Sequence, residues 1–91
     1  MTDPIPRLPR GVRLHDDRVR GIKVLLAPER ALMLDDIGAA ILTAVDGQSR
    51  LSVLAAGLAA AYDAPVDVIA ADMREFLDDL QAQRLLDYAD A

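Results

Sequence analysis

The hydrophobic period of this chain changes at residue 35, and this change limits the possible folds more than any other feature of the sequence. Before this point apolar and polar residues alternate, which is typical of strands with one face on a core. After it the apolar residues follow a helical period. A chain of 91 residues is long enough for one domain only. The sequence therefore predicts a single α+β domain, with strands first and helices after them.

Three short strands are expected in the first third of the chain. Residues 11–15 alternate, residues 22–26 are rich in branched side chains, and residues 31–34 follow a reversal that contains a proline. The first two strands are expected to pair as a hairpin, and an outermost strand leaves an open edge. Residues 1–9 contain three prolines, so we expect an extended arm there and a domain over residues 10–88.

Three helices are expected after the change of period, at about 36–46, 51–62 and 65–84. Asp35 or Asp36 can cap the first helix, Gly47 lies just past its end, and Ser49 offers a cap for the second. Residues 85–88 are expected to form a short extended or frayed tail. Three strands followed by three helices predict a winged helix-turn-helix-like fold.

Catalytic and metal-binding side chains are scarce. The chain has no cysteine, which excludes disulfides and thiolate chemistry. Its one histidine, His15, lies on the polar face of the first expected strand, where we expect a solvated imidazole. The adjacent acidic pairs point apart on a helix or strand, and no glycine-rich phosphate fingerprint occurs. We therefore expect a binding protein with no catalytic residue, no metal and no cofactor.

No segment of the chain is expected to enter a membrane. The longest apolar run, residues 53–62, is far shorter than the roughly 18–20 residues that cross a bilayer. The proline-rich N-terminus does not resemble a signal peptide. A soluble protein is expected, and a cytoplasmic location fits.

The charge is divided unevenly along the chain. Residues 1–34 hold seven basic and four acidic groups, a balance of +3, and residues 35–91 hold three and eleven, a balance of −8, which together give −5. On the third helix, Asp72, Glu75 and Asp79 form an acidic stripe. Phosphates repel such a stripe, which argues against the alternative function, a winged-helix transcriptional regulator that binds DNA. The stripe itself is either a solvated face or an acidic docking site.

Peptide binding is the function that remains for such a module. A short third strand beside a long helix offers unpaired backbone groups and apolar side chains to an extended peptide, which can add as a further strand. In the alternative interpretation, Met33 and Val66 are ordinary core residues, and the proline arm or a second copy of the chain covers the strand edge.

The sequence resembles the PqqD family of pyrroloquinoline quinone (PQQ) biosynthesis, which contains leader-peptide recognition elements of ribosomally made, modified peptides. The resemblance extends from Pro9 to Leu86, and the block Leu-Leu-Ala-Pro-Glu-Arg at 25–30 is its most specific part. Other matching segments are Pro9–Leu14, Asp46-Gly47, Leu58-Ala59 with Tyr62, and Phe76-Leu77 with Leu80. Two positions depart from the family pattern: Asp35-Asp36, where an asparagine is more usual, and Arg84, where a glycine often precedes the final Leu-Leu.

The resemblance implies a peptide chaperone without enzymatic activity. Such a protein binds the precursor peptide PqqA and presents it to the radical S-adenosylmethionine enzyme PqqE, which crosslinks a glutamate and a tyrosine of that peptide. The peptide is expected to add to the third strand, in a groove closed by the third helix. Transferred to this chain, the strand is Ala31, Leu32, Met33 and Leu34. The helix edge, placed by geometry alone, is Val66, Ala70, Met73, Arg74 and Leu77.

A presenting domain also needs a surface for the partner enzyme. The basic N-terminal third is favoured over the acidic stripe, and its candidate residues are Arg10, Arg13, Arg18 and Arg20. Open strand edges invite exchange between copies, so we expect a monomer in dilute solution and a homodimer at high concentration.

Overall fold

The computed structural model describes residues 3–89, which form five strands and three helices. The elements in chain order are β1 (Ile5–Arg7), β2 (Arg13–Asp17), β3 (Ile22–Ala27), β4 (Arg30–Met33), α1 (Asp36–Ala44), α2 (Leu51–Tyr62), α3 (Val66–Ala82) and β5 (Asp87–Ala89). The mixed α+β class, the three helices and the N-terminal hairpin are confirmed. The strand count is wrong, because two further strands form a second sheet.

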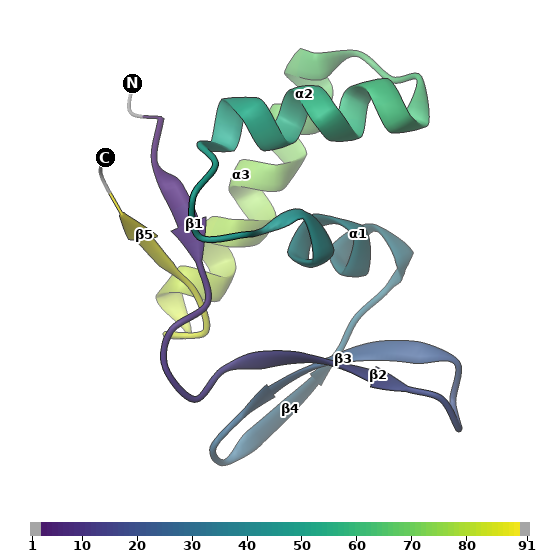
Figure 1. Ribbon diagram of the computed structural model, residues 1–91, viewed down its shortest axis with the longest axis vertical. Helices are drawn as coiled ribbons and strands as arrows, with labels where there is room; N and C mark the ends of the chain where they lie inside the picture. The colour runs from purple at the N-terminus through teal and green to yellow at the C-terminus, as the bar shows by residue number, and fades with distance from the viewer. Residues whose placement is uncertain (1–2, 90–91) are drawn as a thin grey trace.

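The three-stranded sheet is antiparallel, in the order β2-β3-β4. Leu14, Leu25 and Leu32 are directly opposite one another, and this row faces the core. The alternation of a pleated strand then directs the two neighbouring rows to the opposite face of the sheet. Figure 1 shows α1 between this sheet and α2, so the helices cover one face of the sheet only.

The second sheet joins the two ends of the described chain. β1 pairs antiparallel with β5, so that Pro6 lies opposite Tyr88. Buried Leu85 and Leu86 lead into β5, and Pro6 is fully buried. Residues 5–7 of the expected arm are therefore extended but packed on the domain, and the expected C-terminal tail is anchored. Residues 1–2, also part of the expected arm, lie outside the described residues.

The helix boundaries agree with expectation for α2 and are shorter than expected for α1 and α3. Asp35 caps α1, because its carboxylate accepts the Gly38 N–H at 2.7 Å. The expected cap from Ser49 is wrong: the Ser49 hydroxyl donates to Asp46 instead. The cap of α2 comes from the N-terminal segment, where the Asp3 carboxylate accepts the Ser52 N–H at 2.9 Å and the Ser52 hydroxyl at 2.6 Å.

The core lies between the sheet and the helices. Leu25 of β3, Leu42 of α1, Met73 and Leu77 of α3, and Leu86 before β5 are almost completely buried. Burial of this kind stabilises the fold by roughly 1.5–3 kcal/mol for each large aliphatic side chain. None of the helices within residues 3–89 is long and apolar enough to span a membrane.

Candidate functional site: an open strand edge beside the third helix

The outer edge of β4 is the first feature of the candidate site. Among the described residues β4 pairs only with β3. Antiparallel ladders alternate bonded and non-bonded pairs, and the Leu34 N–H donates to the Lys23 carbonyl at 3.0 Å. The next pair, Met33 with Val24, is therefore non-bonded, as is the pair that contains Ala31. The backbone N–H and C=O groups of Ala31 and Met33 consequently point to the open edge.

One contact joins α3 to this strand, and a second joins α3 to the helix that follows the strand. At the start of β4, the Arg30 guanidinium donates to the Gln83 side-chain carbonyl at 2.6 Å. Just beyond the end of β4, the ring of Phe76 lies against the first turn of α1, where a Cβ on Gly38 would be only 3.2 Å from Phe76 Cζ. The helix therefore flanks β4 on the core side of the sheet. Sequence analysis placed neither Phe76 nor Gln83 in the site, although Phe76 follows Asp72 and Gln83 follows Asp79 by four residues.

The acidic stripe lies on the same side of α3 as these two contacts. Asp72, Glu75 and Asp79 are exposed, and together with Phe76 they line a shallow depression. This places three carboxylates along the flank of the open edge. A cationic group is favoured in such a field and an anionic one is repelled.

The strand residues expected to bind peptide divide into two kinds. Met33 is 64% exposed and Ala31 is also exposed, whereas Leu32 packs on the core and Leu34 is buried. The exposed residues are also the two with outward backbone groups. Ala31 and Met33 therefore form the open edge, and Leu32 and Leu34 anchor the strand in the core.

The helix residues expected to close the groove do not lie together on the side of β4. Met73 and Leu77 are 1% and 0% exposed and belong to the core, and Ala70 packs against it. Val66 is half exposed in the first turn of α3. Arg74 lies toward β5, where it pairs with Asp78 at 3.1 Å and covers the Tyr88 ring at 5.4 Å. Core packing turns this face inward, so a different face of α3 flanks the edge.

Tyr88 fixes β5 to α3. Its hydroxyl donates to the Asp78 carboxylate at 2.7 Å. Partial burial is the main reason that the pKa of Tyr88 is raised well above its usual value, and the adjacent Asp78 carboxylate raises it further. The tyrosine is therefore a neutral hydrogen-bond donor at physiological pH, with a structural role.

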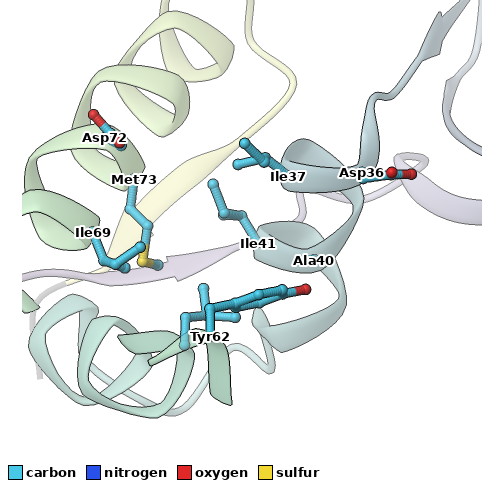
Figure 2. A pocket seen from close by; sticks show the side chains of 9 residues that line it. Asp36, Ile37, Ala40, Ile41, Tyr62, Ile69, Asp72 and Met73 are labelled. Atoms are coloured by element: carbon cyan, nitrogen blue, oxygen red, sulfur yellow. The ribbon is translucent and has the colours of Figure 1, made fainter. Parts of the chain in front are cut away.

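An apolar cavity of about 240 Å³ opens between the three helices, next to this site. Figure 2 shows Ile37 and Ile41 of α1 and Ile69 and Met73 of α3 directed into it, with the Tyr62 ring of α2 across from them. Asp36 and Asp72 lie at its margin, with carboxylates directed outward. Sequence analysis indicated a helical period for the apolar residues of this region and did not predict a cavity.

The basic residues lie around the sheet. Arg10, Arg13, Arg18 and Arg20 are all exposed. Arg13 is in register with Leu26 and through it with Ala31, so its row faces away from the helices. Arg20 is not separate from the strand edge, because its guanidinium donates to the Met33 sulfur at 3.4 Å and lies 3.8 Å from the Asp17 carboxylate.

Within residues 3–89, no group of three or more histidine and acidic side chains is arranged to hold a metal ion. His15 is exposed, as expected, in the row that faces away from the core. The features that stand out are an open edge, a flanking helix and an apolar cavity, and these define a small α+β domain of the class that binds extended peptides.

Comparison with known proteins gives the family. A family model described as coenzyme PQQ synthesis protein D (PqqD) matches residues 23–86. A PqqA binding protein of Rhizobium meliloti is 52% identical over 91% of this chain and 85% of its own length. The bifunctional coenzyme PQQ synthesis protein C/D of Methylorubrum extorquens is 48% identical over 91% of this chain, which matches 22% of that longer protein. The chain belongs to the PqqD family.

Solved structures agree with this assignment. The solution structure of the PqqD part of Methylobacterium extorquens PqqCD, described as a functional, stand-alone RiPP recognition element, is 49% identical. It covers 90% of this chain and 87% of its own, with a TM-score of 0.79. The crystal structure of PqqD from Xanthomonas campestris is 43% identical over 87% and 88% of the two chains, with a TM-score of 0.60. The resemblance inferred from the sequence is confirmed.

Proposed function

We propose that this chain is a peptide chaperone of PQQ biosynthesis that binds a PqqA-type precursor peptide and has no catalytic activity of its own. The observation that carries the proposal is the pair of outward-facing backbone positions on β4, Ala31 and Met33, beside a flanking helix. An extended peptide can satisfy these groups as an added strand. Relatives that carry the name PqqA binding protein support the choice of peptide.

The peptide lies between β4 and the exposed face of α3. The side chains of an added strand alternate, one set toward the helices and the other toward the outer face of the sheet. The inner set meets Phe76 and the acidic stripe, and the outer set meets Met33. This face of α3 replaces the one expected from the sequence. The three-stranded sheet together with α2 and α3 also supports a winged-helix-like description of the fold.

The partner enzyme PqqE is proposed to bind the outer face of the sheet and the hairpin tip. Arg13 lies on that face, and Arg18 lies at the tip, where the Asp17 carboxylate accepts the N–H groups of Val19 and Arg20. The peptide groove is on the helix side of the sheet edge. Separate surfaces allow one domain to contact peptide and enzyme at the same time, as presentation requires.

The DNA-binding alternative finds no support in the site. The exposed face of α3, which would enter the major groove of DNA in a winged-helix regulator, carries Asp72, Glu75 and Asp79. Phosphate contacts supply most of the affinity of such proteins, and three carboxylates oppose them.

The test is Met33→Pro. Because the Met33 N–H points away from β3, proline removes a donor from the open edge without removing a hydrogen bond of the sheet. The matched control is Asp16→Pro in β2, because Asp16 is opposite Lys23 in a pair that the same alternation leaves non-bonded. Its N–H faces the other open edge of the sheet.

We expect Met33→Pro to weaken binding of a synthetic PqqA peptide at least tenfold in titration calorimetry, and Asp16→Pro to change it less than twofold. Circular dichroism checks that both variants are folded. A folded Met33→Pro variant with wild-type affinity would contradict strand addition at β4, and loss of binding in Asp16→Pro alone would move the site to β2.

A further inference from the structure

The cavity between the helices has the dimensions of a pocket for one side chain. Its volume of about 240 Å³ is below the range of about 300–1,000 Å³ that is typical of small-molecule sites. Ile41 and Met73, both almost completely buried, form its floor. Ile37 and Tyr62, which are 69% and 63% exposed, stand at its mouth. Two large apolar residues this exposed, over an apolar floor, indicate a surface that a partner covers.

The cavity continues the proposed peptide groove. Asp72 lines both the cavity and the depression on the exposed face of α3, so the two hollows adjoin. On the other side, Ile37 follows Met33, the last residue of β4, by four positions. Four extended residues span at most about 14 Å, so a peptide paired with β4 reaches the mouth of the cavity within a few residues.

The charges at the mouth restrict what the cavity accepts. Asp36 and Asp72 lie on opposite sides of it with their carboxylates directed outward, and none of the described residues that line it is basic. Burial of an aliphatic or aromatic side chain is favourable in this apolar lining. A cationic residue next to that side chain is favoured in the field of the two carboxylates, and an acidic one is disfavoured.

We propose that this cavity is a second contact for the same peptide: it holds one apolar side chain, whose neighbour in the peptide is cationic and lies outside the mouth, in the field of Asp36 and Asp72. This inference rests on the proposed function, because it places the anchor just beyond the segment that pairs with β4. The specificity of the domain then comes from the anchor, since strand pairing uses backbone groups that every peptide has.

The principal test is Ile37→Asp, which places a charge at the mouth of the cavity. Ile37 is exposed in the first turn of α1, where an acidic residue suits the helix dipole, so the variant is expected to fold. Val53→Asp is the matched control, because Val53 is a similarly exposed residue of α2 that does not line the cavity. Ala40→Leu, which fills the cavity from α1, is a second variant that adds no charge.

We expect Ile37→Asp and Ala40→Leu to weaken binding of the synthetic PqqA peptide about tenfold, and Val53→Asp to change it less than twofold. In an alanine scan of the peptide, replacing one apolar residue should weaken binding to the wild-type protein but not to Ile37→Asp, because that variant already lacks the contact. Asp36→Lys should weaken binding of the natural peptide and favour one in which the cation beside that anchor is replaced by glutamate.

Three outcomes separate the alternatives. Wild-type affinity in both cavity variants, with loss in Met33→Pro, would overturn the anchor and leave strand addition intact. Wild-type affinity in Ile37→Asp, Ala40→Leu and Met33→Pro would overturn the proposed function as well. The hairpin tip of a second copy of the chain offers the same combination as the proposed peptide anchor, since Val19 is 97% exposed between the cationic Arg18 and Arg20. If Ile37→Asp abolishes self-association in sedimentation experiments but leaves peptide binding unchanged, the occupant is a second copy and the proposal is wrong.

Discussion

At the scale of single residues, Arg84 shows how a local departure from the family pattern becomes interpretable in three dimensions. Its backbone adopts φ 62°, in the left-handed region that glycine occupies most easily. The turn it forms lets the chain leave α3 and bring Leu85 and Leu86 into the core. The sequence signalled the position through its departure from the usual glycine, but the strained conformation is visible only in the structure.

Arg84→Gly is therefore expected to stabilise the protein. A left-handed conformation costs a non-glycine residue roughly 1–2 kcal/mol, and the greater freedom of glycine in the unfolded chain offsets part of that gain. We expect the free energy of unfolding to rise by about 0.5–1 kcal/mol in urea denaturation. Arg84→Lys, which keeps the charge and the strain, should match the wild type. A lower stability of Arg84→Gly would mean that the arginine side chain makes a stabilising contact in solution.

At the scale of elements, the strands that pattern reasoning found are those with a strong period, and the strands it missed are those held by distant contacts. β2 and β3 alternate or are rich in branched residues, so they were predicted within a few residues. β1 and β5 have three residues each, and β1 contains a proline, which argues against a strand. Each exists because the other supplies its partner, a pairing that no local pattern encodes.

The N-terminal segment that includes β1 also caps α2, and this gives a prediction for the dependence of stability on pH. Hydrogen bonds from the Ser52 hydroxyl and the Ser52 N–H hold the pKa of Asp3 below its usual value. A carboxylate with a lowered pKa stabilises the folded state above its unfolded pKa, and this stabilisation is lost as the pH falls through the folded pKa. Hydrogen bonds from Ser49 and Gln48 also lower the pKa of Asp46, so this carboxylate likewise contributes stability that is lost at low pH.

We expect Asp3→Ala to lower the Tm by a few degrees at pH 7, as the loss of a helix cap does, and the gap from wild type to close on acidification below about pH 4. Asp16→Ala, which removes an exposed carboxylate of β2, is the control and should leave the Tm nearly unchanged. Calorimetry at several pH values measures both. A gap that persists unchanged at pH 2 would show that the ionised carboxylate does not provide the cap.

At the scale of the whole molecule, the expected strand has an open edge, whereas Met73 and Leu77 of the expected helix face are buried in the core. The third strand and its open edge follow from a local pattern and from strand order. The orientation of α3 depends on how Met73, Leu77 and Leu80 pack against two other helices and a sheet, and the helical period alone does not fix which flank then meets β4. As a result, the acidic stripe lies on the flank of α3 that is turned toward the open edge of β4.

The arrangement of charge over the whole molecule leads to the final prediction. The acidic stripe flanks the open edge of β4, whereas Arg13 and Arg18 lie on the outer face of the sheet and at the hairpin tip. Arg20 is excluded from the test because it contacts Met33. The double variant Arg13→Glu with Arg18→Glu is therefore the cleanest probe of the proposed enzyme surface. Arg7→Glu with Arg84→Glu is a control that changes the net charge equally.

We expect the Arg13 and Arg18 reversal to weaken binding to purified PqqE at least tenfold in low salt, and the difference from wild type to shrink as the salt concentration rises, because screening weakens contacts between exposed charges. Peptide binding should stay within about twofold, or roughly 0.4 kcal/mol. Surface plasmon resonance at two salt concentrations measures the first quantity, and calorimetry measures the second. If the reversal instead weakens peptide binding and spares the enzyme, the outer face of the sheet belongs to the peptide, and PqqE must dock elsewhere.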